Sequence, residues 1–285
     1  MTQSFSDAMK QEVTGSTKPM TEKAFDIAGK VTIVIGGGTG IGAEIAEEFC
    51  RRGAKVMIIS RTMDHLGPVA EGIRKDGGTV EAMVCDVRQN DQVEAVVNKT
   101  VETWGQVDVL INNAGASFVA HAHDISPNGF AAIVAINLNG TFLFSRAAAK
   151  VMMAKKTGGN IINISSDSGV YGSATMSHYG ASKAGVINLT RSLAIEWAPY
   201  GIRVNCISPG PIETEGVKEV LWPTKELQER AINSTALKRF GTGLEIAWPC
   251  VFFASQASSY ITGVNLQVDG CMMRSGSPES RLIET

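Results

Sequence analysis

Short apolar runs alternate with longer amphipathic segments along most of the chain, and this alternation limits the folds available to it. The runs are rich in Val and Ile, which is typical of strands buried on both faces. Strands separated by helices form right-handed βαβ units with parallel strands. Strands are predicted at residues 31–35, 55–60, 79–85, 107–111, 160–165, 202–208 and 264–269, and helices at 40–53, 64–75, 90–104, 128–154, 179–197 and 244–255.

Seven predicted strands in one series indicate the α/β class, with a single doubly wound Rossmann-type domain. We expect a seven-stranded, mostly parallel sheet with helices on both faces. With 285 residues, 44% of them hydrophobic, the chain can bury a large core. We expect the domain to span residues 25–273, after a flexible polar arm at 1–24 and before a C-terminal tail at 274–285.

Charge and cysteine content exclude several functional classes. Lys and Arg number 26 against 28 Asp and Glu, so we expect no nucleic-acid partner. No uninterrupted apolar run of about 18 residues and no signal peptide are visible, so we expect no membrane association. The cysteines are odd in number and form no CxxC motif, which favours reduced thiols, no metal site and a cytoplasmic location. They are Cys50, Cys85, Cys206, Cys250 and Cys271.

A glycine-rich turn, GGGTGIG, joins the first predicted strand to the first predicted helix. Glycines at such a place permit a tight turn and bring backbone N–H groups close to a pyrophosphate. The turn alone is a weak signal, but its position between strand and helix is the one that dinucleotide binding requires. The predicted cofactor contacts of this turn are Gly36, Gly38, Thr39, Gly40, Ile41 and Gly42.

The end of the second strand predicts which dinucleotide binds. An acidic residue there would bond the ribose 2′-hydroxyl of NAD, but this chain has Ser60 followed by Arg61. A guanidinium is a planar, bidentate partner for phosphate. The sequence therefore predicts NADP(H), with Arg61 facing the 2′-phosphate; the alternative is that Arg61 is a solvated loop residue.

One of the four tyrosines is followed by a lysine four residues later: Tyr179, with Lys183. Residues at this spacing share a helix face. A free phenol has a pKa of about 10, and a nearby ammonium or an oxidised nicotinamide favours the phenolate. We expect Tyr179 to act as general acid and base, and Lys183 to lower its pKa and bind the nicotinamide ribose.

The Gly36-x₃-Gly40-x-Gly42 turn, the Tyr179–Lys183 pair and the string NISS resemble the short-chain dehydrogenase/reductase family. The resemblance covers about residues 25–271. It implies a Rossmann fold, oxidoreductase activity with a nicotinamide cofactor, and an assembly that is commonly a homotetramer, or else a homodimer. Helices 128–154 and 179–197 would then form one subunit interface.

The resemblance also implies two further catalytic residues. Ser166 lies thirteen residues before Tyr179 and would orient the substrate oxygen. Asn137, in the string INLNGTF, would hold a water that links Lys183 to solvent as a proton relay. Competing candidates by residue type are Ser165, Ser168 and Asn139.

Three other segments resemble cofactor contacts of that family. One pair would line the adenine, one turn would pass beside the ribose, and one segment would border the nicotinamide. In this sequence the adenine pair is Asp86 and Val87, the turn is Asn113, Ala114 and Gly115, and the nicotinamide segment contains Pro209, Gly210, Pro211, Ile212 and Thr214.

The substrate is less constrained than the cofactor. The strings SLAIEWAPYGIRVN and PGPIETEG resemble the enoyl-CoA and dienoyl-CoA reductase branch, although the retained triad suits C=O/CH–OH chemistry. We therefore expect reduction of a carbonyl or oxidation of a secondary alcohol. The alternatives are C=C reduction of an acyl thioester and a catalytically silent cofactor-binding protein. Residues 212–241 would form a substrate lid, and Gly270-Cys271 replaces the usual glycine pair.

Three histidines near the expected site are not assigned a catalytic role. His178 directly precedes Tyr179, but a rim or packing role is the better interpretation for it and for His121 and His123.

Overall fold

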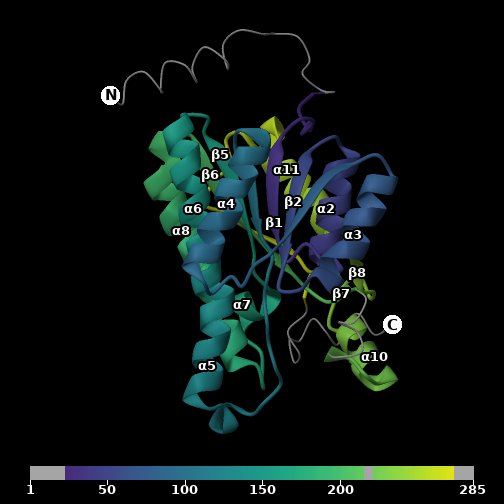
Figure 1. Cartoon of the computed structure of the whole chain (residues 1–285). Coiled ribbons are helices and arrows are strands. Elements are labelled where there is room, and N and C mark those ends of the chain that lie inside the picture. Colours follow the sequence, from purple (N-terminus) through teal and green to yellow (C-terminus); the bar gives the residue numbers. More distant parts are fainter. Residues whose placement is uncertain (1–22, 215–220, 273–285) are drawn as a thin grey trace.

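A parallel seven-stranded sheet forms the centre of the protein (Figure 1). The computed structural model describes residues 23–214 and 221–272. The strand order is β3-β2-β1-β4-β5-β6-β9, and every pairing in this sheet is parallel. This confirms the predicted fold class. The strands are β1 (Val31–Ile35), β2 (Lys55–Ser60), β3 (Thr79–Val84), β4 (Val109–Asn112), β5 (Gly159–Ile164), β6 (Ile202–Pro209) and β9 (Asn265–Val268).

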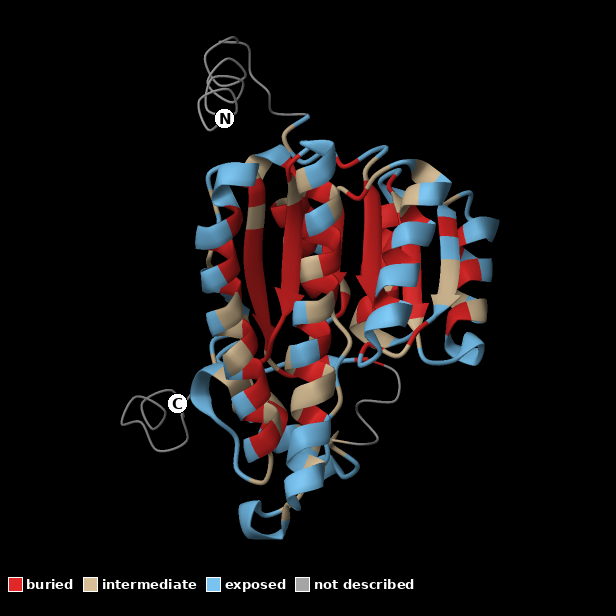
Figure 2. Cartoon of the chain, turned by 60° about the vertical axis from the view of Figure 1, so that its left-hand side comes forward, coloured by how far each residue is buried: buried red, intermediate tan, exposed pale blue. Residues whose placement is uncertain are grey.

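Helices cover both faces of the sheet, because successive strand side chains point to opposite sides. Val34 packs into one core, whereas Ile33 and Ile35 pack into the other. Figure 2 shows the buried strands between helices whose outer sides are exposed. The first core contains α2 (Gly40–Arg51), α3 (Met63–Lys75) and α11 (Leu244–Ala254); the second contains α4 (Asn90–Trp104), α6 (Gly140–Lys155) and α8 (Ser177–Trp197).

The strand order reverses between β1 and β4, which lie side by side in the middle of the sheet. The chain builds outward from β1 through β2 to β3, then returns to β4 and builds outward on the other side. Open parallel sheets bind ligands outside the carboxyl ends of the strands at such a reversal. The predicted glycine turn follows β1, and the predicted ribose turn follows β4, so the fold brings both to this point.

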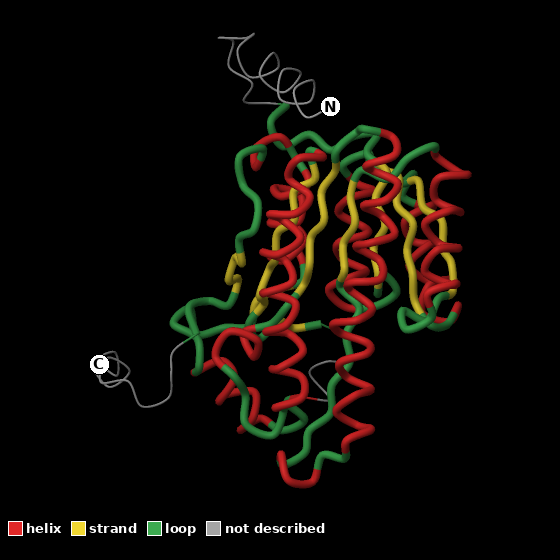
Figure 3. The backbone as a smooth tube through the Cα atoms, turned by 90° about the vertical axis from the view of Figure 1, so that its left-hand side faces the viewer, coloured by secondary structure: helices red, strands yellow, loops and turns green. Residues whose placement is uncertain are grey.

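The helix predicted at 128–154 consists of three parts. They are α5 (Pro127–Val134), the π-helical segment η2 (Ala135–Asn139) and α6, and the run extends beyond the strand ends (Figure 3). By length and composition alone, the whole run Pro127–Lys155 could cross a membrane. Phe144 and Ala148 are fully buried in the second core. Within this run, α6 therefore packs its buried side chains into the second core, against the sheet.

Several short elements that the sequence did not predict lie around the carboxyl ends of the strands. They include α7 (Asp167–Tyr171) and the small parallel pair β7 (Ile212–Glu213) and β8 (Gly241–Thr242). The expected lid at 212–241 contains β7, part of β8 and α10 (Lys225–Asn233), while residues 215–220 lie outside the described residues. The expected tail and nearly all of the expected arm also lie outside them. The remaining short helices are η1 (Ala122–Asp124), η3 (Ala198–Tyr200) and η4 (Gln256–Ser258).

Candidate active site

The glycine turn after β1 is too tight to accept side chains. Gly36 and Gly40 have positive φ angles of 77° and 52°. A Cβ atom on Gly42 would lie 2.0 Å from the carbonyl oxygen of Gly36, so only glycine fits there. Asn113, after β4, donates its side-chain N–H to that same carbonyl over 3.2 Å. The turn and the neighbouring strand end are therefore held together.

A cavity of about 890 Å³, a volume that includes open solvent, begins at this turn. It lies across the ends of β1, β2, β3 and β4, where the strand order predicts a ligand crevice. Nine of the predicted cofactor residues line it: Gly36, Thr39, Ser60, Arg61, Asp86, Val87, Asn113, Ala114 and Gly115. The lining residues that the sequence did not single out are Ile35, Ile59, His65, Cys85, Arg88, Ala116 and Ile136.

Charge in this cavity is unevenly distributed. The guanidinium Nε of Arg88 donates to both carboxylate oxygens of Asp86, over 2.9 and 3.0 Å. This contact, with a smaller contribution from Arg61, lowers the pKa of Asp86, so the carboxyl stays ionised and paired. Arg61 is exposed at the end of β2. The cavity therefore combines a neutralised ion pair with a further guanidinium.

Two polar residues of the cavity were missed because neither belongs to a recognised motif. Arg88 follows Asp86 in the loop after β3. His65 lies in the first turn of α3, and a Cβ atom on Gly38 would approach its Cβ atom to 3.0 Å. Both stand near the carboxyl end of a predicted strand, so a search of every polar residue at that edge of the sheet could have found them.

The cavity adjoins the residues predicted to be catalytic. A Cβ atom on Gly115 would lie 3.4 Å from Nζ of Lys183 and 3.5 Å from Oδ1 of Asn137. On the other side of the turn, a Cβ atom on Gly40 would lie 3.3 Å from Oγ1 of Thr214. The glycine turn, the ribose turn, the catalytic helix α8 and the expected nicotinamide segment therefore meet at one edge of the sheet.

Lys183 is a buried cation, only 3% exposed. Its Nζ donates to the carbonyl oxygen of Ile164 over 2.8 Å and lies 5.7 Å from the centre of the Tyr179 ring. Burial lowers the pKa of Lys183 to about 8. The side chain therefore gains and loses its proton within the range in which most enzymes work.

Tyr179 is half-buried beside Ser166. Burial, with a smaller contribution from the Asp167 carboxylate, raises the pKa of the Tyr179 phenol to about 12, although the Ser166 hydroxyl acts in the opposite direction. Lys183, whose ammonium is bonded to the carbonyl oxygen of Ile164, is not among the groups that shift the pKa of Tyr179, so the expected lowering is not seen. The phenol is therefore protonated at neutral pH and can donate that proton.

The three candidate serines have different partners. Ser165 donates its hydroxyl to the carbonyl oxygen of Lys183 over 2.8 Å, which ties β5 to α8. Ser168 donates its hydroxyl to Asp167 over 3.3 Å. Ser166 caps the N-terminus of α7, and its hydroxyl lies close enough to the phenol of Tyr179 to lower the pKa of that phenol. Of the three, Ser166 is therefore the one placed to share a ligand oxygen with the phenol.

Asn137 lies in the π-helical segment and is fully buried. Its Nδ2 donates to the carbonyl oxygen of Ala116 over 3.0 Å and to Oγ of Ser182 over 2.9 Å, while its Oδ1 accepts from the Ala116 N–H over 2.8 Å. Asn139 is exposed instead. The Asn137 side chain thus fixes the loop after β4 to the helix that carries Tyr179 and Lys183. The water relay expected at Asn137 stays a prediction.

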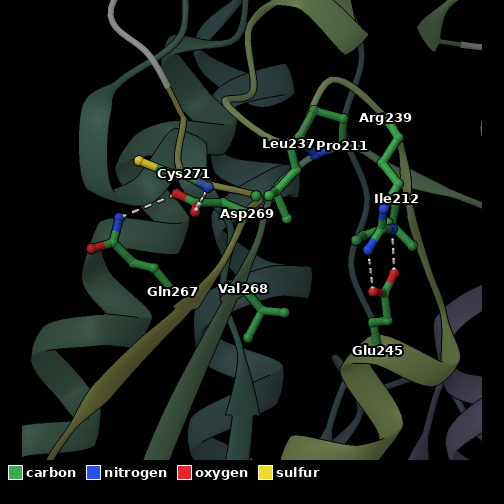
Figure 4. A pocket seen from close by; sticks show the side chains of 11 residues that line it. Pro211, Ile212, Leu237, Arg239, Glu245, Gln267, Val268, Asp269 and Cys271 are labelled. Carbon is green, nitrogen blue, oxygen red and sulfur yellow. Dashed lines mark hydrogen bonds and ion pairs between the residues drawn. The ribbon is translucent and has the colours of Figure 1, made fainter.

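The segment after β6 borders a second cavity of about 590 Å³ (Figure 4). Pro211 and Ile212 line one side of it. On another side, Arg239 pairs with both carboxylate oxygens of Glu245 over 2.8 and 2.6 Å, and this lowers the pKa of Glu245 to about 2. Pro209, Gly210 and Thr214 do not line either cavity.

The opposite wall of that second cavity is the end of β9. Asp269 accepts the backbone N–H of Cys271 over 2.9 Å. Cys271 adopts a left-handed backbone conformation, with a φ of 59°, which is ordinarily a glycine conformation. Its thiol is exposed, whereas the other four cysteines are buried and all five are free.

The histidines are placed as packing and surface residues. His178 is fully buried, and its ring centre lies 4.1 Å from that of Phe118. His121 and His123 are exposed and stack on each other. Within residues 23–214 and 221–272, no cluster of three or more His, Cys, Asp or Glu residues could hold a metal ion.

Comparisons with known proteins agree with this geometry. The protein family described as Enoyl-(Acyl carrier protein) reductase matches residues 36–272. A protein of Bacillus subtilis (strain 168) named probable 2,4-dienoyl-CoA reductase, (2E)-enoyl-CoA-producing, is 38% identical over 242 residues, which cover 85% of this chain and 95% of that protein. L-rhamnose 1-dehydrogenase (NAD(P)(+)) of Azotobacter vinelandii is 40% identical over 245 residues, which cover 85% of this chain and 95% of that enzyme.

A solved structure gives the same result for the fold. A crystal structure from Beutenbergia cavernae, with NADP bound at low occupancy, has a TM-score of 0.82 and 35% sequence identity to this chain. The match covers 87% of this chain and 98% of that one.

Proposed function

Because the chain belongs to the short-chain dehydrogenase/reductase family of oxidoreductases, we propose that it transfers hydride between NADP(H) and a carbonyl or secondary alcohol substrate. One observation carries this proposal. The Ser166 hydroxyl lies close enough to the protonated phenol of Tyr179 to lower its pKa, and Lys183 lies on the same helix face as Tyr179. A hydroxyl and a phenol arranged in this way can hold one substrate oxygen between them and exchange a proton with it.

The residues present fit a nicotinamide dinucleotide. Gly36 and Gly42 leave a cradle that a Cβ atom would fill, and the large cavity begins there. The backbone of this turn would hold the pyrophosphate, Arg61 would hold a 2′-phosphate, and Lys183 would hold the nicotinamide ribose. When bound, the nicotinamide supplies or accepts the hydride. NADP in the Beutenbergia cavernae structure supports the choice of phosphorylated cofactor.

The chain's own residues would manage the proton and the substrate oxygen. In reduction, Tyr179 donates its proton to the oxygen that becomes the alcohol, and in oxidation the same phenol oxygen receives it. Ser166 holds that oxygen in place. Lys183 places a positive charge beside the phenol, and Asn137 fixes the helix that carries both residues to the loop after β4.

The similarity to 2,4-dienoyl-CoA reductase favours a second candidate function, C=C reduction of an acyl thioester. In that case Tyr179 would donate its proton to the reduced thioester skeleton instead of to a carbonyl oxygen. The similarity to L-rhamnose 1-dehydrogenase supports the first candidate equally directly. A third possibility is a silent cofactor-binding protein, which the retained Ser166, Tyr179 and Lys183 argue against.

The test is to titrate the purified protein with NADPH and NADH, then assay a panel of ketones, aldehydes, 3-oxoacyl thioesters and 2-enoyl thioesters. We expect NADPH-dependent turnover of a carbonyl. Tyr179→Phe should lower kcat at least about 100-fold, because it removes the proton donor. Its Kd for NADPH should stay within about twofold of wild type, since the phenol oxygen contributes little to cofactor binding.

Tyr260→Phe is the matched control, because Tyr260 is fully exposed and should leave kcat unchanged. Turnover of 2-enoyl thioesters alone would assign the C=C reaction. Tight NADPH binding without turnover of any compound would indicate the silent protein. Carbonyl turnover that survives in Tyr179→Phe would contradict the proton-donor role.

A further inference from the structure

A half-buried carboxylate stands beside the proposed catalytic serine, and the mechanism above makes no use of it. Asp167 is the first residue of α7. Its Oδ1 accepts the hydroxyl of Ser166 over 2.7 Å, the backbone N–H of Ser168 over 2.6 Å and the hydroxyl of Ser168 over 3.3 Å. Three donors on one oxygen hold this carboxylate in a single orientation.

The hydrogen bond from Ser166 determines what that serine can offer a ligand. A hydroxyl group has one hydrogen and two lone pairs. Since the hydrogen of Ser166 is given to Asp167 and one lone pair accepts the backbone N–H of Ser168 over 3.2 Å, a single lone pair remains for the phenol of Tyr179 or a substrate oxygen. It can then accept from an alcohol, which carries a hydrogen, but it cannot donate to a carbonyl, which has none.

Charged and titratable groups surround Asp167 on several elements. From α8 come Tyr179, whose pKa the Asp167 carboxylate raises, and Lys183, whose ammonium is bonded to Ile164. Asp269 contributes a negative charge from the end of β9, where Figure 4 shows its carboxylate.

Together these groups raise the pKa of Asp167. Burial has the largest effect and raises the pKa of Asp167, and the charge of Asp269 raises it further. The hydrogen bonds from Ser166 and Ser168 act in the opposite direction but do not cancel the increase. The carboxyl therefore titrates above its ordinary range, closer to the pH at which an enzyme works.

We propose that Asp167 is a positioning residue that sets the direction of the Ser166 hydrogen bond. While ionised, Asp167 holds the Ser166 hydrogen; once it binds a proton its hold weakens, and Ser166 is released to donate to a substrate carbonyl. This inference rests on the proposed function, because it acts through Ser166. It makes carbonyl reduction depend on the ionisation of Asp167, with faster reduction on the acid side.

The first test measures kcat/KM against pH with the carbonyl that the panel shows to be turned over fastest. In wild type, kcat/KM should fall about tenfold as Asp167 ionises, which is the difference between a charged and a neutral hydrogen bond. Asp167→Asn keeps the size of the side chain but cannot ionise, so this step should disappear from its profile. A step that persists at the same midpoint in Asp167→Asn would overturn the proposal.

A second variant separates Asp167 from its acidic neighbour. Asp269→Asn removes a like charge while keeping an acceptor for the Cys271 N–H, so the midpoint of the step should move to lower pH. In a Ser166→Ala background, Asp167→Asn should change the pH profile no further, because Asp167 acts through that serine. An additional change of the profile in this background would overturn the proposal.

A substrate-free readout keeps this inference separable from the proposed function. In the full-length protein with ¹³C-labelled aspartate, the Asp167 carboxyl carbon, assigned by its loss in Asp167→Asn, should titrate above the ordinary midpoint of about 3.9. Ser166→Ala removes a bond that stabilises the carboxylate, so the midpoint should rise. An unchanged midpoint in Ser166→Ala would overturn the inference. A panel without carbonyl turnover would instead contradict the proposed function alone.

The matched control is Asp76→Asn. Asp76 is exposed at the end of α3, away from the catalytic helix, so this substitution should leave both the kinetic profile and the Asp167 titration as in wild type. If Asp167→Asn fails to fold, Asp167→Ala supplies the assignment, and the Asp269→Asn shift and the Ser166→Ala shift still decide the question.

Discussion

We expect single charged residues to decide which cofactor the cavity prefers. The charge of Asp86 is neutralised by Arg88, which leaves Arg61 as the guanidinium available to a 2′-phosphate. We predict that Arg61→Ala raises the Kd for NADPH about 10- to 100-fold, because a hydrogen bond to a charged group contributes about 1.5–3 kcal/mol. The Kd for NADH should change less than about threefold. Fluorescence titration at fixed salt measures both, and equal losses would refute the phosphate contact.

The pKa of Lys183 gives a prediction about stability. The folded-state pKa is about 8, below the ordinary value of 10.5, so burying the ammonium costs stability. Between these values the unfolded chain binds more protons than the folded one, and the contribution of Lys183 to stability therefore rises with pH. Urea unfolding should show the stability of wild type relative to Lys183→Met increasing from pH 8 toward pH 10. A constant difference over that range would show that the pKa is not lowered.

Residues with a fixed role at a fixed spacing could be predicted from the sequence, and residues whose role depends on the folded surroundings could not. Tyr179 and Lys183 are one helical turn apart, so their proximity follows from helix geometry. Asp167 acts on Ser166 through a hydrogen bond, and its pKa is raised by the charge of Asp269, which lies about a hundred residues later in the chain. Arg88 matters because it neutralises Asp86, which no local pattern indicates.

At the scale of elements, the turn between β1 and α2 requires glycines, because a side chain would not fit there. We predict that Gly42→Ala lowers NADPH affinity at least about tenfold and destabilises the fold, because its Cβ atom would lie 2.0 Å from the carbonyl oxygen of Gly36. Gly72→Ala is the matched control: it lies inside α3 with no atom within 4 Å of its Cβ position. That control should bind NADPH as wild type does and gain up to about 1 kcal/mol. Thermal unfolding and NADPH titration of both variants distinguish a clash at Gly42 from the general effect of replacing a glycine with alanine.

Element prediction succeeded where one periodicity runs without interruption. The bounds of β1, β2 and α4 agree with the predicted ranges because each has a uniform apolar or helical pattern. The five-residue helix α7 is too short for such a pattern to be visible. The π-helical segment also escaped prediction, since it differs from an α-helix by hydrogen-bond register rather than by residue type. Both unpredicted elements carry side chains of the candidate site: Asn137 lies in the π-helical segment and Asp167 in α7. Local departures from regular structure are expected at functional sites.

The exposed apolar side chains of the whole molecule bear on its assembly. On one face of the sheet, α6 exposes Phe142 and α8 exposes Ile195, which is 79% accessible. Exposed apolar surface on adjacent helices is typical of a protein interface, and we propose that these helices join subunits of a homotetramer or homodimer. Sedimentation velocity should show an oligomer whose mass falls to one half or less in Ile195→Glu, because an unpaired buried charge is costly. Met63→Glu introduces the same charge at an exposed position of α3, on the opposite face, and should leave the mass unchanged. A monomeric wild type, or an Ile195→Glu variant that assembles normally, would contradict this interface.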